Sequence, residues 1–343
     1  MRRARGLPVV AAAALLVAGC HAGVEPVAVL VPPPVTPAPV PPTPPPAPVA
    51  PTEGSVGLEA CKGARLDVDF QKLRAAPRAE WIRRLFLHDA RFADLAVAGV
   101  VEPFGDARVA RFCAAVLRGG DWDAIVLTHR LEPPTVEAAL RVYSARVDEG
   151  GSEALGVPGV QGTRVRTGDT AWSAQRARAG ELLLVPAEAG PRSASLYRGS
   201  APLDPAGLED PASAPAAGAL VARLTLDAPA QRMPWAPDLS ELRSLRAELR
   251  ATPAGTAELR AKGEAVDAAA ALALAARLTA RAEEVGRPLA VRMVLRGLLS
   301  SLKVRTNGAE VEVRLPASAP QVDALLALVA AAVGARLDGP PDP

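Results

Sequence analysis

Residues that commonly carry catalysis are scarce in this chain. Its 343 residues include three histidines, three cysteines, two tyrosines and five phenylalanines, and aromatic side chains make up 3% of the whole. A metal site needs three or four ligands with at least one local pair, and His21, His88 and His129 are too far apart in the sequence to form one. The sequence therefore predicts no metal centre and no bound cofactor.

Motifs of nucleophilic catalysis are also missing. The sequence has no Gly-x-Ser-x-Gly. Ser300 and Lys303 have the Ser-x-x-Lys spacing of penicillin-interacting serine enzymes, in which the lysine activates a serine one helical turn away. Here Lys303 falls in an expected strand, and the Ser-Asp-Asn and Lys-Thr-Gly motifs do not follow. We interpret the tetrapeptide as a chance match.

The histidines and tryptophans allow a structural and a functional interpretation. His88 ends an amphipathic segment, where a histidine complements the helix dipole, and His129 is expected on the solvent side of a strand. The tryptophans are the richest recognition residues, and exposure in a loop would indicate a carbohydrate or protein contact, whereas burial would indicate core packing. The four tryptophans are Trp81, Trp122, Trp172 and Trp235. Trp122 and Trp235 fall in predicted turns.

The first 19 residues have the layout of a secretory signal peptide. Three arginines precede an apolar core, Leu7 to Ala18, which is too short to span a bilayer that needs roughly 20 residues. At the end of this core, Val17-Ala18-Gly19-Cys20 resembles the lipobox of bacterial lipoproteins. The resemblance implies cleavage before Cys20 and acylation of its sulfur and amine, which anchor the protein firmly to a membrane. His21 at the second mature position resembles outer-membrane cargo, so we expect the domain in the periplasm or at the cell surface; an ordinary cleaved signal peptide is the alternative.

Charge argues against nucleic acid as a partner. Without the three leader arginines the chain has 36 basic and 37 acidic residues, a formal charge of −1. A near-neutral protein without a basic run gains little from the release of counterions.

Two cysteines remain after Cys20 is assigned to the lipid. In an oxidising compartment a disulfide between Cys61 and Cys113 is the favoured expectation, and it would close a loop worth up to roughly 4 kcal/mol. A reactive thiol or two buried free cysteines are the alternatives.

Residues 20–53 form a proline-rich linker. The prolines, 13 of them between Val24 and Thr52, prevent helix or sheet formation and favour polyproline II. At about 3.1 Å per residue, this stretch reaches roughly 90 Å when fully extended. We interpret it as a tether.

The rest of the chain is expected to fold as α+β, with antiparallel sheets packed against helices in two related subdomains. The boundaries are 54–201 for the first, 202–217 for a linker, 218–338 for the second and 339–343 for a disordered tail. The first half predicts helices over 69–87, a hairpin split at Gly119-Gly120, a helix from Pro134 and three short strands. This order resembles lipoproteins of myxobacteria and similar GC-rich bacteria, a resemblance that implies no activity.

The second half has the clearest local pattern. Strands are expected on both sides of a turn at 253–255, followed by a buried helix that Asp267 caps and Gly286 ends. Asn307-Gly308 predicts a type I′ hairpin turn, and a last helix begins at Pro320. The flanking valines and leucines should face the core, while the charged residues should face water: Lys303, Arg305, Glu310, Glu312 and Arg314.

These features predict a lipid-anchored envelope protein. The favoured hypothesis is a non-catalytic module that binds an envelope protein or a cell-wall component, or supports an assembly. The alternatives are a hydrolase or transferase in which His88 or His129 joins other groups in a pocket, and a carrier of lipid or lipoprotein with an apolar cavity of at least roughly 300 Å³.

Replacing Cys20 with serine tests the anchor. Because the variant lacks the sulfur that the lipid requires, we expect it to incorporate no labelled palmitate in growing cells, while the parent protein is labelled. The neighbouring Ala22→Ser is the matched control and should be labelled like the parent. Labelling of Cys20→Ser at the parental level would contradict the lipobox.

Overall fold

The structure is a computed structural model. It describes residues 63–97, 102, 105–114, 122–146, 162–167, 170–178, 180–186, 218–229, 239, 241–287, 293, 295, 297–335 and 337. The predicted leader, tether, linker at 202–217 and tail lie outside the described residues.

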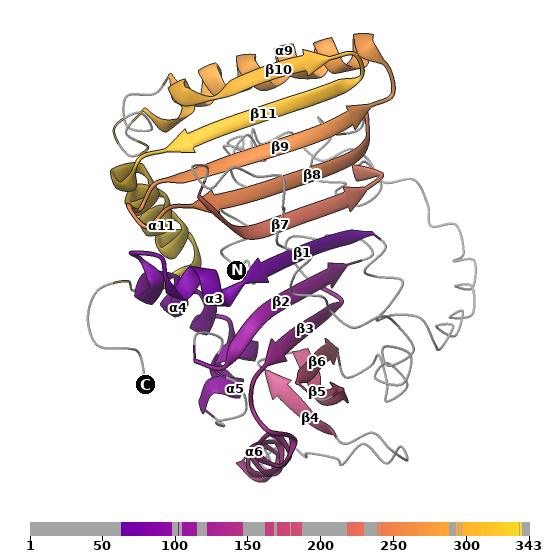
Figure 1. Ribbon diagram of the computed structural model, residues 1–343, viewed down its shortest axis with the longest axis vertical. Helices are drawn as coiled ribbons and strands as arrows, with labels where there is room; N and C mark the ends of the chain where they lie inside the picture. The colour runs from indigo at the N-terminus through magenta and orange to yellow at the C-terminus, as the bar shows by residue number, and fades with distance from the viewer. Residues whose placement is uncertain are drawn as a thin grey trace, which may run out of the picture.

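The fold is built on one antiparallel sheet of 11 strands, in the order β10-β11-β9-β8-β7-β1-β2-β3-β6-β5-β4. Figure 1 shows it from β10 at the top to β4 near the bottom. The strands are β1 (Ala64–Asp69), β2 (Ala107–Ala114), β3 (Ala124–His129), β4 (Gly162–Thr167), β5 (Thr170–Arg178), β6 (Glu181–Pro186), β7 (Ala219–Asp227), β8 (Leu242–Ala251), β9 (Ala257–Ala265), β10 (Lys303–Asn307) and β11 (Glu310–Ala317). The predicted α+β class with an antiparallel sheet is confirmed.

Two subdomains with separate sheets are not confirmed. β1, from the first half of the chain, pairs with β7, from the second half, so that Asp67 lies opposite Arg223. The sheet is therefore continuous across the predicted boundary. β1 was not among the predicted strands, because its pairing partners β2 and β7 are both distant in the sequence.

The helices pack against the apolar face of this sheet. They are α3 (Phe70–Arg74), α4 (Ala79–Leu87), α5 (Ala90–Val97), α6 (Pro133–Arg146), α9 (Ala268–Gly286) and α11 (Ala319–Val333), with a short 3-10 turn η5 (Leu298–Ser301). The helices predicted over 69–87 are confirmed as α3 and α4; Pro77 lies between them, where its missing N–H and its ring interrupt the helix. Within the described part of the chain, no helix is long and apolar enough to cross a membrane.

A row of aromatic rings forms the centre of the core in the first half. The ring centroids of Phe70 and Phe86 are 4.8 Å apart, and those of Phe86 and Phe92 are 5.7 Å apart. Phe92 continues to Phe112 at 6.1 Å, and Phe112 to Trp122 at 5.7 Å. The rings are tilted or edge-on, arrangements that aromatic pairs prefer. They join α3, α4 and α5 to β2.

The C-terminal hairpin is confirmed, but its turn differs from the prediction. Asn307 pairs with Glu310, so the loop consists of Gly308 and Ala309. Gly308 has φ of 58°, and Ala309 is not among the residues with positive φ. A positive φ at the first loop position alone is the pattern of a type II′ turn, which favours glycine there. The type I′ assignment was therefore shifted by one residue.

The expected burial of α9 is only half correct. Asp267 caps the helix through a 2.7 Å hydrogen bond to the N–H of Ala270, as predicted, and the helix ends at Gly286. Ala271 and Leu274 are buried against the sheet, whereas Leu272 is 61% exposed. An all-apolar first half thus does not bury every side, because α9 contacts the sheet with one face.

We expect Phe86→Ala to lower the free energy of unfolding by about 3–5 kcal/mol, since it leaves a cavity between two rings. Leu272→Ala on exposed α9 is the matched control and should change it by less than about 0.5 kcal/mol. Urea denaturation followed by circular dichroism measures both variants. Equal losses for the two would contradict the described core.

Candidate functional site

One face of strands β8 to β11 is charged. Alternate residues of these strands point away from the helices, and the strand register brings them into rows. Lys262 of β9, for example, lies between Arg246 of β8 on one side and Glu312 of β11 on the other. We call this surface the charged face. It comprises Arg246, Glu248, Arg250, Glu258, Arg260, Lys262, Glu264, Lys303, Arg305, Glu310, Glu312 and Arg314.

Most bases of the charged face have an acidic partner. Arg260 donates to Glu258 at 2.6 Å, and Lys262 donates to Glu310 at 3.1 Å. Arg314 donates to one oxygen of Glu312 through Nε at 2.9 Å and Nη2 at 2.7 Å. Ion pairs therefore hold three of the bases in place.

Glu248 is the most enclosed acid of the charged face. Its carboxylate lies 2.6 Å from Arg246, 3.2 Å from Arg223 of β7 and 3.3 Å from Arg250. Burial acts to raise the pKa of Glu248, but the hydrogen bonds and charges of these arginines outweigh it and lower the pKa. Glu248 thus stays ionised and is shared by three arginines.

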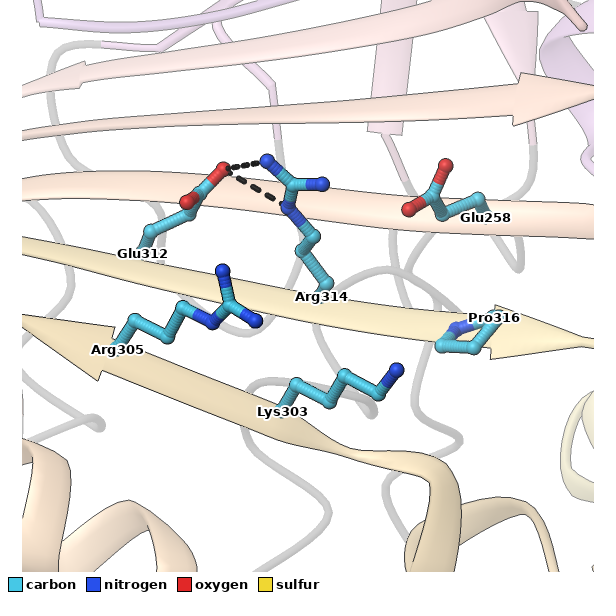
Figure 2. A pocket seen from close by; sticks show the side chains of 6 residues that line it. All are labelled: Glu258, Lys303, Arg305, Glu312, Arg314 and Pro316. Atoms are coloured by element: carbon cyan, nitrogen blue, oxygen red, sulfur yellow. Dashed lines mark hydrogen bonds and ion pairs between the residues drawn. The ribbon is translucent and has the colours of Figure 1, made fainter. Parts of the chain in front are cut away.

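A hollow lies at the β10 end of the charged face (Figure 2). It holds about 140 Å³ and is open to solvent. Its lining is Glu258, Lys303, Arg305, Glu312, Arg314 and Pro316. This volume is smaller than the roughly 300 Å³ that a small-ligand pocket needs, and the walls are charged, so the hollow does not favour the alternative of an apolar lipid cavity.

Two bases of the hollow differ from the rest. Lys303 and Arg305 are exposed on β10, and neither forms an ion pair with a described residue. Lys303 lies directly opposite Arg314, a like charge, which is unfavourable across a pair of strands. Arg305 lies opposite Glu312, whose carboxylate binds Arg314 and whose pKa is lowered first of all by that hydrogen bond. Positive charge is therefore concentrated at this edge.

The sequence identified part of this site. Lys303, Arg305, Glu312 and Arg314 were predicted to face water, and they do lie on the face away from the core. Glu258 was missed as a neighbour, because the pairing of β9 with β11 is not local. The alternation of charged and apolar residues in 257–265 was the signal that could have placed β9 beside an equally alternating strand.

The two histidines that the structure describes lie in different environments. His88 is exposed at the C-terminal end of α4, as predicted. The solvent-facing position expected for His129 is wrong: it is 6% exposed at the end of β3, and neither ring nitrogen has a hydrogen-bond partner among the described residues. Burial lowers its pKa, while the backbone of Leu131 and the charge of Asp106 act more weakly in the opposite direction.

Neither chemistry considered from the sequence is assembled in the described residues. Ser300 lies in η5 and donates to the carbonyl of Gly297 at 2.6 Å, while Lys303 lies in β10, so the two are not on one helical face. No group of three or more histidine, cysteine, aspartate or glutamate side chains that could hold a metal ion occurs among the residues described.

The tryptophans that the structure describes are not loop anchors. Trp122 is 2% exposed and packs against Phe112, which favours the core interpretation. Trp81 is half-buried, with the guanidinium of Arg78 5.5 Å from its ring centroid. Trp172 lies in β5, and Trp235 is outside the described residues.

Cys113 is buried in β2 and disulfide-bonded. Cys20 and Cys61 lie outside the described residues, so the Cys61–Cys113 pairing and lipidation at Cys20 stay predictions.

Comparisons with known proteins give little further information. No protein-family model and no curated protein matches the chain. Among solved structures, crystal form I of TP0453 aligns with 10% sequence identity over 80% of this chain and 97% of that chain, with a TM-score of 0.42.

The buried imidazole of His129 predicts a pH-dependent stability. Because its pKa is lower in the folded than in the unfolded protein, the unfolded chain binds more protons as the pH falls below about 6.5, and stability declines. We expect urea titrations at pH 7.5 and pH 5 to show a smaller difference in unfolding free energy for His129→Gln than for the parent, by about 1.4 kcal/mol for each unit of pKa lowering. A parental difference in His129→Gln would contradict the assignment.

Proposed function

We propose that this protein is a lipid-anchored envelope protein whose α+β domain is a non-catalytic binding module for another envelope component. The observation that supports this most is the charged hollow at the edge of the sheet, where Lys303 and Arg305 lack acidic partners. Arg260, Lys262 and Arg314 on the same face each have an acidic partner, whereas the two bases of β10 form no ion pair with a described residue. Departures from local charge matching are expected at functional surfaces.

The shape of the site supports binding more than catalysis. The hollow is open to solvent, and its described lining has no histidine, the side chain that most often carries general acid–base catalysis. His129 is buried at the end of β3, on a strand far from β10 in the sheet order.

The predicted anchor and tether are compatible with this function. Acylation at Cys20 would hold the chain at a membrane, expected to be the outer membrane, and a tether of roughly 90 Å lets the domain search a wide volume around its anchor. A tethered module meets partners in the same envelope at a raised effective concentration. A modest affinity at the hollow is then sufficient.

Chemical crosslinking in intact cells tests the proposal. The test variant is Lys303→Glu/Arg305→Glu, and the matched control Arg130→Glu/Arg287→Glu reverses two exposed bases elsewhere. We expect the parent and the control to capture the same envelope component, and the test variant to recover at least about tenfold less of it, the effect of losing a few favourable charge contacts.

Two results would contradict the proposal. One is that no envelope component is enriched with the parent protein. The other is that the test variant and the control recover it equally.

A further inference from the structure

The open edge of β10 has main-chain groups available for pairing. β10 is the last strand of the described sheet on that side. Residues that flank a two-residue loop form a hydrogen-bonded pair, and bonded and non-bonded pairs alternate from there. Since Asn307 pairs with Glu310, the N–H and C=O groups of Val304 and Thr306 point to the open edge. No described residue outside the sheet hydrogen-bonds to them.

The same strand carries two bases that form no ion pair with a described residue, although the charge of Arg305 helps to lower the pKa of Glu312. Lys303 and Arg305 are two residues apart and therefore project from one face of β10. The acid nearest in register, Glu312, binds Arg314. Glu264, an acid of the charged face without an ion pair, lies on β9, and β11 separates it from β10. Carboxylates that complement β10 have to come from another strand.

A second copy of this chain does not meet this need. If two β10 strands paired, Lys303 and Arg305 would face the same bases or Asn307 in either register. Like charges directly opposite each other are unfavourable, and bases on an edge strand are a common protection against self-association. The charge pattern thus argues against a symmetric pair formed by this edge.

We propose that β10 is the docking site for an extended acidic segment of another protein, which adds to the sheet as a further antiparallel strand. Carboxylates at alternate positions of the segment pair with Lys303 and Arg305, while its main chain bonds to Val304 and Thr306. The inference rests on the proposed binding function and names the chemistry of the partner.

The surroundings of β10 add two requirements on the partner. On the charged face, Figure 2 shows the guanidinium of Arg314 directed away from Lys303 toward Glu312, so an acidic side chain opposite Lys303 meets the lysine itself. On the other face, Val304 belongs to the apolar core and α9 packs beside β10. A segment that alternates glutamate with valine or threonine satisfies both faces.

Peptide binding tests the inference directly. The probe is a fluorescein-labelled peptide, Thr-Glu-Val-Glu-Val-Glu-Thr, and the protein is the mature chain with Cys20→Ser. Fluorescence anisotropy at low salt should give saturable binding that Lys303→Glu/Arg305→Glu weakens by at least about tenfold, as expected for the loss of two cross-strand charge pairs. Arg130→Glu/Arg287→Glu is the control and should bind like the parent, with circular dichroism confirming that each variant is folded.

Altered peptides separate charge from strand pairing. A peptide with lysine in place of each glutamate should bind Lys303→Glu/Arg305→Glu better than it binds the parent. Two further peptides keep the original charges but are N-methylated at alternate residues, each in one of the two possible frames. The peptide whose methyl groups replace the N–H groups that face β10 cannot donate to this strand and should bind at least about tenfold more weakly.

Three results would overturn the inference: no saturable binding of the acidic peptide to the parent, an unchanged affinity in Lys303→Glu/Arg305→Glu, or full affinity of both N-methylated peptides. If the peptides fail while crosslinking in cells still shows a partner that depends on Lys303 and Arg305, the binding function stands and strand addition is wrong. If no partner is captured in cells, the binding function itself fails.

Discussion

The antiparallel pairing of β1 with β7 is the contact on which the rest of this fold depends. It joins the strands of the first half to those of the second and makes one sheet of eleven strands. Ion pairs accompany it: buried Asp67 on β1 binds Arg111 on β2 at 2.6 Å, and Arg223 on β7 binds Glu248 on β8 at 3.2 Å. Removing one member of a partly buried ion pair leaves the other charge uncompensated and destabilises the fold. These contacts therefore also fix the register of the central strands.

Local patterns were predictable from the sequence, and non-local pairings were not. The hairpin of β10 and β11, the cap at Asp267 and the strands around 253–255 depend on residues close together, so alternation and turn chemistry were sufficient to predict them. β1 was missed because both of its partners follow it at a distance in the chain: paired residues are 40 to 50 positions apart in β2 and more than 150 positions apart in β7. The turn at Gly308 shows the limit even of a strong local signal, since Asn-Gly fits two adjacent loop registers.

The candidate site follows the same division. The outward direction of Lys303 and Arg305 came from alternation alone. Their lack of acidic partners depends on which strand lies beside β11 and on how Arg314 and Arg260 use the available carboxylates, which only the assembled sheet decides. Burial of His129 was missed for a related reason: β3 is flanked by β2 and β6, and a strand inside a sheet can bury a polar residue that a period-two pattern assigns to solvent.

Amide hydrogen exchange tests the central claim most directly. If β10 receives an acidic strand, the N–H groups of Val304 and Thr306 become hydrogen-bonded, and their exchange should slow at least about tenfold when the acidic peptide is saturating. The N–H of Arg305 already faces β11 and should change much less. Slowed exchange at another part of the sheet, with Val304 and Thr306 unchanged, would contradict the account.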